Sequence, residues 1–220
     1  MEAPVRLTRE HVLAVALDVL DEAGLDGLTM RRLSAALGVE NGATYWHFRS
    51  KQELLEHMAD ALLAEVATEL PADRPWDELV PALARGLRRA LLSRRDGARL
   101  FSGRFFPLPN ALAYGEALVG LLAAAGLDPR SAAWASDALT YYVVAHVTEE
   151  QLAAALPDGG DAARARLEAG LDPARHPHLV AARADLASAD PDAHFEHGLA
   201  LVLAGIRATA PQQPTSRAAR

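Results

Sequence analysis

One stretch near the N-terminus, Thr29 to Lys51 (TMRRLSAALGVENGATYWHFRSK), constrains the fold of this chain more than any other. Leu33 and Leu37 stand one helical turn apart and predict a helix with one inward face. Thr29 has the hydroxyl group typical of a helix N-cap. Gly38 stands where this helix would end, because glycine tolerates the positive φ common at helix C-termini. The stretch therefore begins with a short capped helix.

A second helix is predicted over residues 42–47, opened by Asn41, after a turn of three to four residues. Ser50-Lys51-Gln52-Glu53 then has the pattern of a capping box and predicts a third helix. Helix, tight turn and helix in this order are typical of the helix-turn-helix, which lays its second helix in the major groove of DNA. The alternative is a small helical subdomain whose aromatic residues only fill a core.

The distribution of charge favours the DNA-binding interpretation, although the total charge opposes it. The whole chain carries a net charge of −7 and a pI near 5.6. The acidic residues lie mostly outside residues 30–51, whereas this short segment contains four cationic side chains and one acid, Glu40. We therefore predict a basic head and an acidic body, with DNA binding confined to one face. The four cations are Arg31, Arg32, Arg49 and Lys51.

The residues of this region resemble a known family. GVENGATYWHFRSKQELLEHMA is similar to the DNA-binding segment of the tetracycline-repressor (TetR) family of bacterial transcriptional regulators, and the likeness covers roughly residues 6–60. Three later pieces resemble the helical C-terminal domain of the tetracycline-repressor branch: LLSRRDGARLF, LLAAAGLDPRSAAWASDALTYYVVAHVTEEQ and FEHGLALVLAGI. The resemblance implies a homodimer closed by a four-helix bundle, a palindromic operator, and a ligand pocket in each body.

Composition agrees with an all-α protein that has an N-terminal helix-turn-helix head and a larger helical body. Alanine and leucine dominate, aromatic residues make up 5% of the chain, and there is no cysteine. We divide the chain into residues 1–68 (head with its connecting helix), 69–208 (regulatory and dimerisation domain) and 209–220 (a disordered tail). No apolar run reaches 18 residues, so we predict a soluble, cytoplasmic protein.

The remaining helices are predicted from caps and from leucine spacing. Expected helices run from Thr8 to Gly24, 51–68, from Pro75 through a distortion at Pro81, from Pro109 to Ala125, 128–156, 179–188, and from Asp190 to about 208. A short helix or turn is expected over 94–101. Residues 157–177 show no clear periodicity and predict a mobile loop with room for one helical piece.

The resemblance implies roles for individual residues of the head. Arg31 would read a base edge through its two-pronged guanidinium. Three residues at the start of the recognition helix would face bases, and the remaining positions would contact phosphates. The first group is Asn41, Gly42 and Ala43, and the second is Thr29, Tyr45, Trp46, His47 and Lys51.

The resemblance also implies where a ligand and a second subunit would bind. Positions that match polar drug contacts in the family are apolar here, namely Ala67, Leu83, Leu87 and Leu118, and Phe101 stands in place of a metal-binding histidine. The candidate polar groups of this mainly apolar pocket are Asn110, Tyr141, Tyr142 and His146. Glu149 matches an acidic residue that supports the metal in the family. The predicted dimer interface comprises Trp134, Phe195, Leu199, Val202 and Ile206.

We therefore predict a homodimeric regulator, most simply a repressor, released from its operator by a small, mainly apolar molecule. The alternatives are a DNA-binding regulator without a ligand and a small-molecule-sequestering protein with a vestigial head. A core that holds no ligand is a further alternative for the body. No cofactor, metal or enzymatic activity is predicted, because the histidine pairs at 176/178 and 194/197 lack further ligands and no catalytic motif is present.

Overall fold

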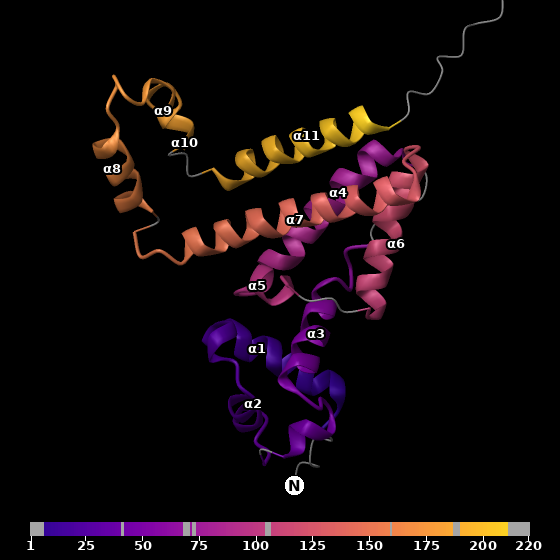
Figure 1. Ribbon diagram of the computed structural model, residues 1–220. Coiled ribbons are helices and arrows are strands. Elements are labelled where there is room, and N and C mark those ends of the chain that lie inside the picture. Colours follow the sequence, from indigo (N-terminus) through magenta and orange to yellow (C-terminus); the bar gives the residue numbers. More distant parts are fainter. Residues whose placement is uncertain are drawn as a thin grey trace, which may run out of the picture.

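The computed structural model describes residues 7–40, 42–67, 71, 74–103, 107–158, 160–186 and 190–210. All regular structure in these ranges is helical, which confirms the all-α prediction (Figure 1). The elements are α1 (Arg9–Gly27), α2 (Met30–Ala36), the 3-10 helix η1 (Ala43–Trp46), α3 (Lys51–Leu62), α4 (Trp76–Leu92), α5 (Gly97–Phe101), α6 (Pro109–Ala124), α7 (Pro129–Ala154), α8 (Asp161–Gly170), α9 (Pro177–Ala181), α10 (Arg183–Leu186) and α11 (Pro191–Thr209).

The head consists of α1, α2, η1 and α3, at the lower end of Figure 1. Thr8 and Thr29 cap α1 and α2 as predicted, with hydroxyl oxygens that accept from the backbone N–H groups of His11 and Arg32. Gly24 has a φ of 70°, so it interrupts α1 where its end was predicted, but one more helical turn follows. The two capped helices thereby meet at a fixed angle below the body.

Helix α3 connects the head to the body. The Ser50 hydroxyl accepts from the Glu53 N–H at 3.0 Å, while the Glu53 carboxylate accepts from the Arg49 N–H at 2.8 Å. The capping box is therefore present, with its return bond shifted by one residue from the usual pattern. The helix ends at Leu62 and turns follow to residue 67, so the predicted helix was too long; Thr68 lies outside the described residues.

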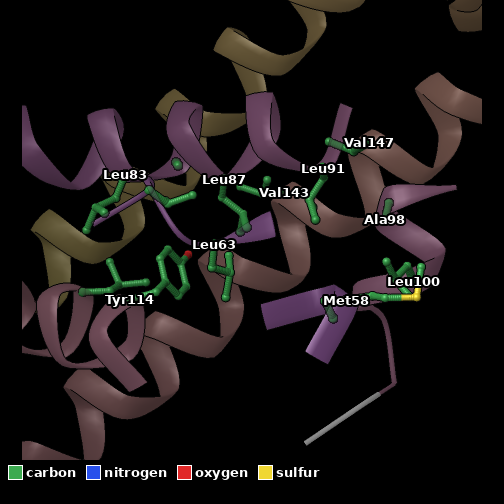
Figure 2. Packing of buried hydrophobic residues seen from close by; sticks show 14 of the residues in the cluster. Met58, Leu63, Leu83, Leu87, Leu91, Ala98, Leu100, Tyr114, Val143 and Val147 are labelled. Carbon is green, nitrogen blue, oxygen red and sulfur yellow. The ribbon is translucent and has the colours of Figure 1, made fainter. Parts of the chain in front are cut away.

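The body is built around α7, which packs against α4, α6 and α11. Figure 2 shows Tyr114 of α6 below Leu83 and Leu87 of α4, with Val143 and Val147 of α7 further along the same core. Helix α4 continues through Pro81, so the expected distortion does not break it. Pro81 lies early in the helix, where losing one backbone donor costs least. The core runs unbroken from the head through α3 into the body.

Helices α8, α9 and α10 form an arm that projects from the body in Figure 1. None of these three helices contains a buried residue. The segment predicted as a loop contains α8, and the single helix predicted over 179–188 is instead two short helices, with residues 187–189 outside the described ranges. The prediction allowed one helical piece in that segment, and the alanine-rich composition without an apolar stripe explains why periodicity did not locate it. The tail was predicted to begin at residue 209, but α11 continues to Thr209; residues 211–220 lie outside the described residues.

Within the described ranges, every helix falls short of the length or the apolarity that crossing a membrane requires.

Candidate nucleic-acid interface and effector region

The tip of the head exposes two large aromatic side chains. Trp46 is 90% exposed and Tyr45 is 46% exposed, and both belong to η1. The predicted recognition helix is thus a single 3-10 turn, in which Tyr45 N–H bonds to Gly42 and His47 N–H bonds to Thr44. An indole left this open has no packing role in the chain, so the tip is a candidate contact surface.

Buried hydroxyl groups hold the tip against α2. The hydroxyl oxygens of Ser34 and Thr44 lie 3.1 Å apart, and Ser34 donates to the Met30 carbonyl at 3.0 Å. Thr44 is fully buried although its neighbours on both sides in η1 are not. The sequence analysis did not predict this pair. A small polar residue among the apolar residues of the inward helix face would have indicated it.

A second group of side chains supports η1 from below. The Arg9 guanidinium lies over the ring of fully buried Phe48, 4.5 Å from its centroid, and donates to Glu53 at 2.9 Å. The same guanidinium lies 2.6 Å from Nε2 of His57, which requires the neutral imidazole as acceptor. Burial, followed by the charge of Arg9, lowers the pKa of His57. The Arg49 N–H bond lowers the pKa of Glu53.

The predicted DNA-contacting residues cluster around this tip, but with different exposure. Arg31, Thr29 and Gly42 are exposed, whereas Ala43, His47 and Lys51 are half-buried. The Thr29 oxygen already accepts from the Arg32 N–H, so only its hydroxyl proton is available for a phosphate. Asn41 lies outside the described residues.

Ion pairs connect α1 of the head to the turn between α4 and α5 of the body. Arg94 donates to Asp21 at 2.6 Å, and the same carboxylate accepts from the Arg95 N–H at 2.9 Å. Arg99 donates to both oxygens of Asp26 at 3.1 Å. We call this contact the brace. Sequence reasoning did not find it, because its two halves are more than 70 residues apart.

The geometry of the brace depends on an unusual turn. Asp96 adopts a left-handed φ of 57°, and its carboxylate accepts from the Leu25 N–H at 2.8 Å. At the next residue, Gly97, a Cβ atom would collide with the carbonyl group of Leu91. The turn therefore requires glycine at this position.

The apolar positions of the predicted ligand site lie in the core of the body. Leu83, Leu87 and Leu118 are fully buried, and Figure 2 shows the first two near Tyr114. Tyr114 was missed; its hydroxyl lies 3.3 Å from that of Thr140, and burial raises its pKa to about 12. A buried phenol gives this apolar region a polar group. Two further predicted positions, Ala67 and Phe101, are half-buried.

The predicted polar groups of the ligand site do not converge there. Asn110 donates to Asp60 of α3 at 3.0 Å, Tyr142 donates to the Phe195 carbonyl at 2.6 Å, and His146 lies 3.1 Å from the Pro191 carbonyl. Burial lowers the pKa of His146 and raises that of Tyr142. Tyr141 and Glu149 are exposed on the outer face of α7.

A cavity of about 340 Å³ lies between the head and the body. Its lining comes from α1, the end of α3 with the turns after it, and α4, and includes Leu17, Ala61, Leu62, Glu65, Gly86 and Arg89. It is separate from the buried leucines of the predicted ligand site, none of which line it. This space was not predicted.

The apolar residues of α11 that were predicted to contact a second subunit mostly pack against their own chain. Phe195, Leu199 and Ile206 are buried on the inner face of α11, while Val202 is half-buried. Gly198, predicted to admit a partner helix, instead admits Tyr142, whose ring would collide with a Cβ atom there.

Large apolar side chains are also exposed on α7 and α11, and we call this set of residues the outer stripe. Its large members are Trp134, Tyr141, Leu152 and Leu201, and Leu201 is 62% exposed. Among the predicted interface residues, only Trp134 belongs to it.

No group of three or more His, Asp or Glu side chains arranged for a metal ion is found within the described ranges.

Two family models match the chain. Residues 12–58 match "Bacterial regulatory proteins, tetR family", and residues 70–210 match "Tetracyclin repressor-like, C-terminal domain". The class A tetracycline repressor protein from transposon 1721 of Escherichia coli is 39% identical over 203 residues, which is 91% of each chain.

Solved structures resemble this chain over almost its whole length. A possible TetR family regulator from Streptomyces coelicolor A3(2) is 43% identical with a TM-score of 0.82, covering 91% of this chain and 99% of that one. The Streptomyces coelicolor TetR family protein ActR, solved in complex with actinorhodin, is 33% identical with a TM-score of 0.85, covering 94% and 100%.

Proposed function

Because this chain belongs to the tetR family of bacterial regulatory proteins, we propose that it is a ligand-responsive transcriptional repressor that binds DNA as a homodimer. The family comprises transcription factors and not enzymes. Residues 1–68 would form the DNA-binding head, and residues 69–208 the regulatory and dimerisation domain. Acting on DNA in a bacterial cell would place the protein in the cytoplasm.

The observation that carries this proposal is the exposed tip of the head. Trp46 and Tyr45 project from a turn that is fixed from within by Thr44 and Phe48. Exposed aromatic side chains on this turn, together with exposed Arg31 of α2, suit contact with a phosphate backbone and a base edge. Phosphate contacts would come from Thr29, Tyr45, Trp46, His47 and Lys51, and base contacts from Arg31, Asn41, Gly42 and Ala43.

A second subunit would cover the outer stripe of α7 and α11. Single exposed apolar residues are common on monomers, but two adjacent helices with large apolar side chains along one face are typical of an interface. A two-fold dimer would present two tips to successive major grooves about 34 Å apart, so the operator should be a palindrome.

The effector would be a small, mainly apolar molecule with few polar groups. Leu83, Leu87 and Leu118 offer no hydrogen bonds, so each unpaired polar group of a buried drug would cost about 1–3 kcal/mol. Phe101 cannot coordinate a metal ion in the way that a histidine can. A magnesium–tetracycline complex therefore fits poorly, whereas an aromatic or polyketide-like ligand with few polar groups would lose less.

The test is a fluorescence-anisotropy titration of the protein on DNA from its own upstream region. Bound complexes are then challenged with tetracycline plus magnesium, with tetracycline plus chelator, and with a panel of apolar aromatic compounds. We expect release by a member of the apolar panel only. Release by micromolar tetracycline that chelator abolishes would contradict the apolar effector.

The two other functions from the sequence remain distinguishable by the same titration. Binding without release by any compound, and without any thermal shift, would favour a regulator that has no small-molecule ligand. Compound binding without DNA binding would favour a sequestering protein.

A further inference from the structure

Asp60 is a carboxylate buried at the joint between head and body. It lies near the C-terminus of α3 and is 6% exposed. Its two side-chain oxygens accept from the Ala111 N–H at 2.8 Å and from the Asn110 amide at 3.0 Å. The Asn110 amide also donates to the Asp60 carbonyl at 3.2 Å. A buried carboxylate is tolerated only with such bonds, so these contacts hold α3 at one place on α6.

The bonds of Asp60 are directional because they involve the first turn of α6. That helix begins at Pro109, so the Ala111 N–H lacks a partner within the helix. The carboxylate supplies that partner and lies at the positive end of the helix dipole. Sliding or rotating α3 on α6 would break the bonds to both oxygens together.

Helix α3 transmits this position to the tip of the head. It runs without interruption from the Ser50 cap, two residues after buried Phe48, to Leu62, a length of about 18 Å. A change of angle at Asp60 therefore displaces η1 at the far end of the rod.

Space beside Asp60 allows α3 to move once it is released. The next two residues, Ala61 and Leu62, line the 340 Å³ cavity shared with α1 and α4. A helix held by polar bonds on one side, with unfilled space beside it, has a second position available.

We infer that Asp60 is a positioning residue that fixes the angle of the head on the body by holding α3 against the first turn of α6. The same helix α6 carries Tyr114 and Leu118 of the effector region. A ligand that shifts α6 would therefore move the head through Asp60. The regulatory part of this inference rests on the proposed DNA-binding function.

The test uses the full-length chain and two variants of the contact. In Asp60→Asn, one side-chain oxygen becomes an amide group that faces the amide of Asn110, so a bond is replaced by two opposed donors. Asn110→Ala removes the same bond but leaves the bond between the Asp60 carboxylate and the Ala111 N–H. It therefore tests the same contact if the first variant fails to fold. Glu56→Gln is the matched control, because Glu56 lies on the same helix and its carboxylate accepts from the Gln52 amide at 2.8 Å instead of from α6.

Two measurements separate a positioning role from a merely structural one. The sequence has no cysteine, so cysteines placed at exposed Ala36 and Ala124 report the head–body distance by pulsed spin-label spectroscopy, diluted with unlabelled protein. We expect a narrow distance distribution in wild type and Glu56→Gln, and a broad or shifted one in both variants. Operator affinity should fall about tenfold in the variants at a temperature where all are folded.

A variant with a lowered melting temperature but wild-type distance distribution and affinity would overturn the inference, since Asp60 would then only stabilise the joint. Failure of the wild-type chain to bind DNA would refute the proposed function and not this inference, because the distance measurement needs no DNA. An unchanged distance distribution in both variants overturns the inference in either case.

Discussion

The hydroxyl oxygens of Ser34 and Thr44 lie 3.1 Å apart in the interior of the head, one on α2 and one on η1. Both residues are buried, so this contact sets the spacing between the supporting helix and the aromatic tip. The tip exposes Trp46 almost completely, so the side chains that keep it in place are the buried ones, Thr44 and Phe48.

Thr44→Val keeps the side-chain shape but removes the hydroxyl group. Ser34 retains its bond to the Met30 carbonyl, so we expect a loss of about 1 kcal/mol in the free energy of unfolding. Operator affinity should fall as well, because η1 is no longer aligned with α2. Urea unfolding and anisotropy measure the two effects, and a stable variant with unchanged affinity would show that the hydroxyl pair does not position the tip.

Arg31→Ala and Lys51→Ala should weaken DNA binding in different ways. Lys51→Ala should weaken binding to all sequences and reduce the slope of log affinity against log salt by about one unit. Arg31→Ala should cost about 1–3 kcal/mol and blunt discrimination at one base pair. Arg166→Ala, exposed on α8, is the control. Equal affinity of wild type and Arg31→Ala for operator would refute the base-reading role.

Leu201→Asp should dissociate the proposed dimer. It places a charge in the outer stripe, where a partner subunit would bury it without a counter-charge at a cost of several kcal/mol. Leu112→Asp on α6 is the matched control, because Leu112 is 58% exposed and lies outside that stripe. Sedimentation should show monomer for the first variant and dimer for the second. Dimers in both would place the interface elsewhere.

The free energy of unfolding should decrease as pH falls below about 6.5, the ordinary pKa of histidine. Burial lowers the pKa of His57 and of His146, so the unfolded chain binds more protons between the folded-state pKa values and 6.5. Stability therefore rises with pH in this window and is lost towards acid. Protonation of His57 would also abolish its acceptor role towards Arg9.

The pH dependence is measured from urea midpoints at pH 7.5 and 5.5, at one protein concentration. His57→Gln should reduce the difference between the two midpoints. An undiminished difference in His57→Gln would assign the effect to other groups.

Local signals predicted the helices well. Thr8, Thr29, Ser50, Asp128 and Asp190 each cap the helix that the sequence assigned to them, because a cap depends only on residues within one turn. The fold class and the family followed from the same segments. Helix type was less predictable: residues 43–46 form a 3-10 turn, a choice decided by the fit of Thr44 beneath α2.

Contacts between distant parts of the chain could not be predicted. Asn110 was assigned to a ligand, but its amide bonds to Asp60, fifty residues earlier. Phe195 and Leu199 were assigned to a partner subunit, because an apolar stripe on α11 does not reveal whether its neighbour belongs to the same chain. Leu201 lies on the same helix, and the sequence did not show that it is exposed. Its exposure follows from the way α11 packs on α7.

The turn at Gly97 limits how proteins of this design can diversify. The pair of Arg99 and Asp26 in the brace can change signs together, since it involves only side chains, whereas Asp21 also accepts from the Arg95 main-chain N–H. Gly97 has no such freedom, because any β-carbon would collide with the main chain at Leu91. In a library built on this scaffold, the side-chain pair between head and body can therefore be varied, while the glycine at the corner beside it must be kept.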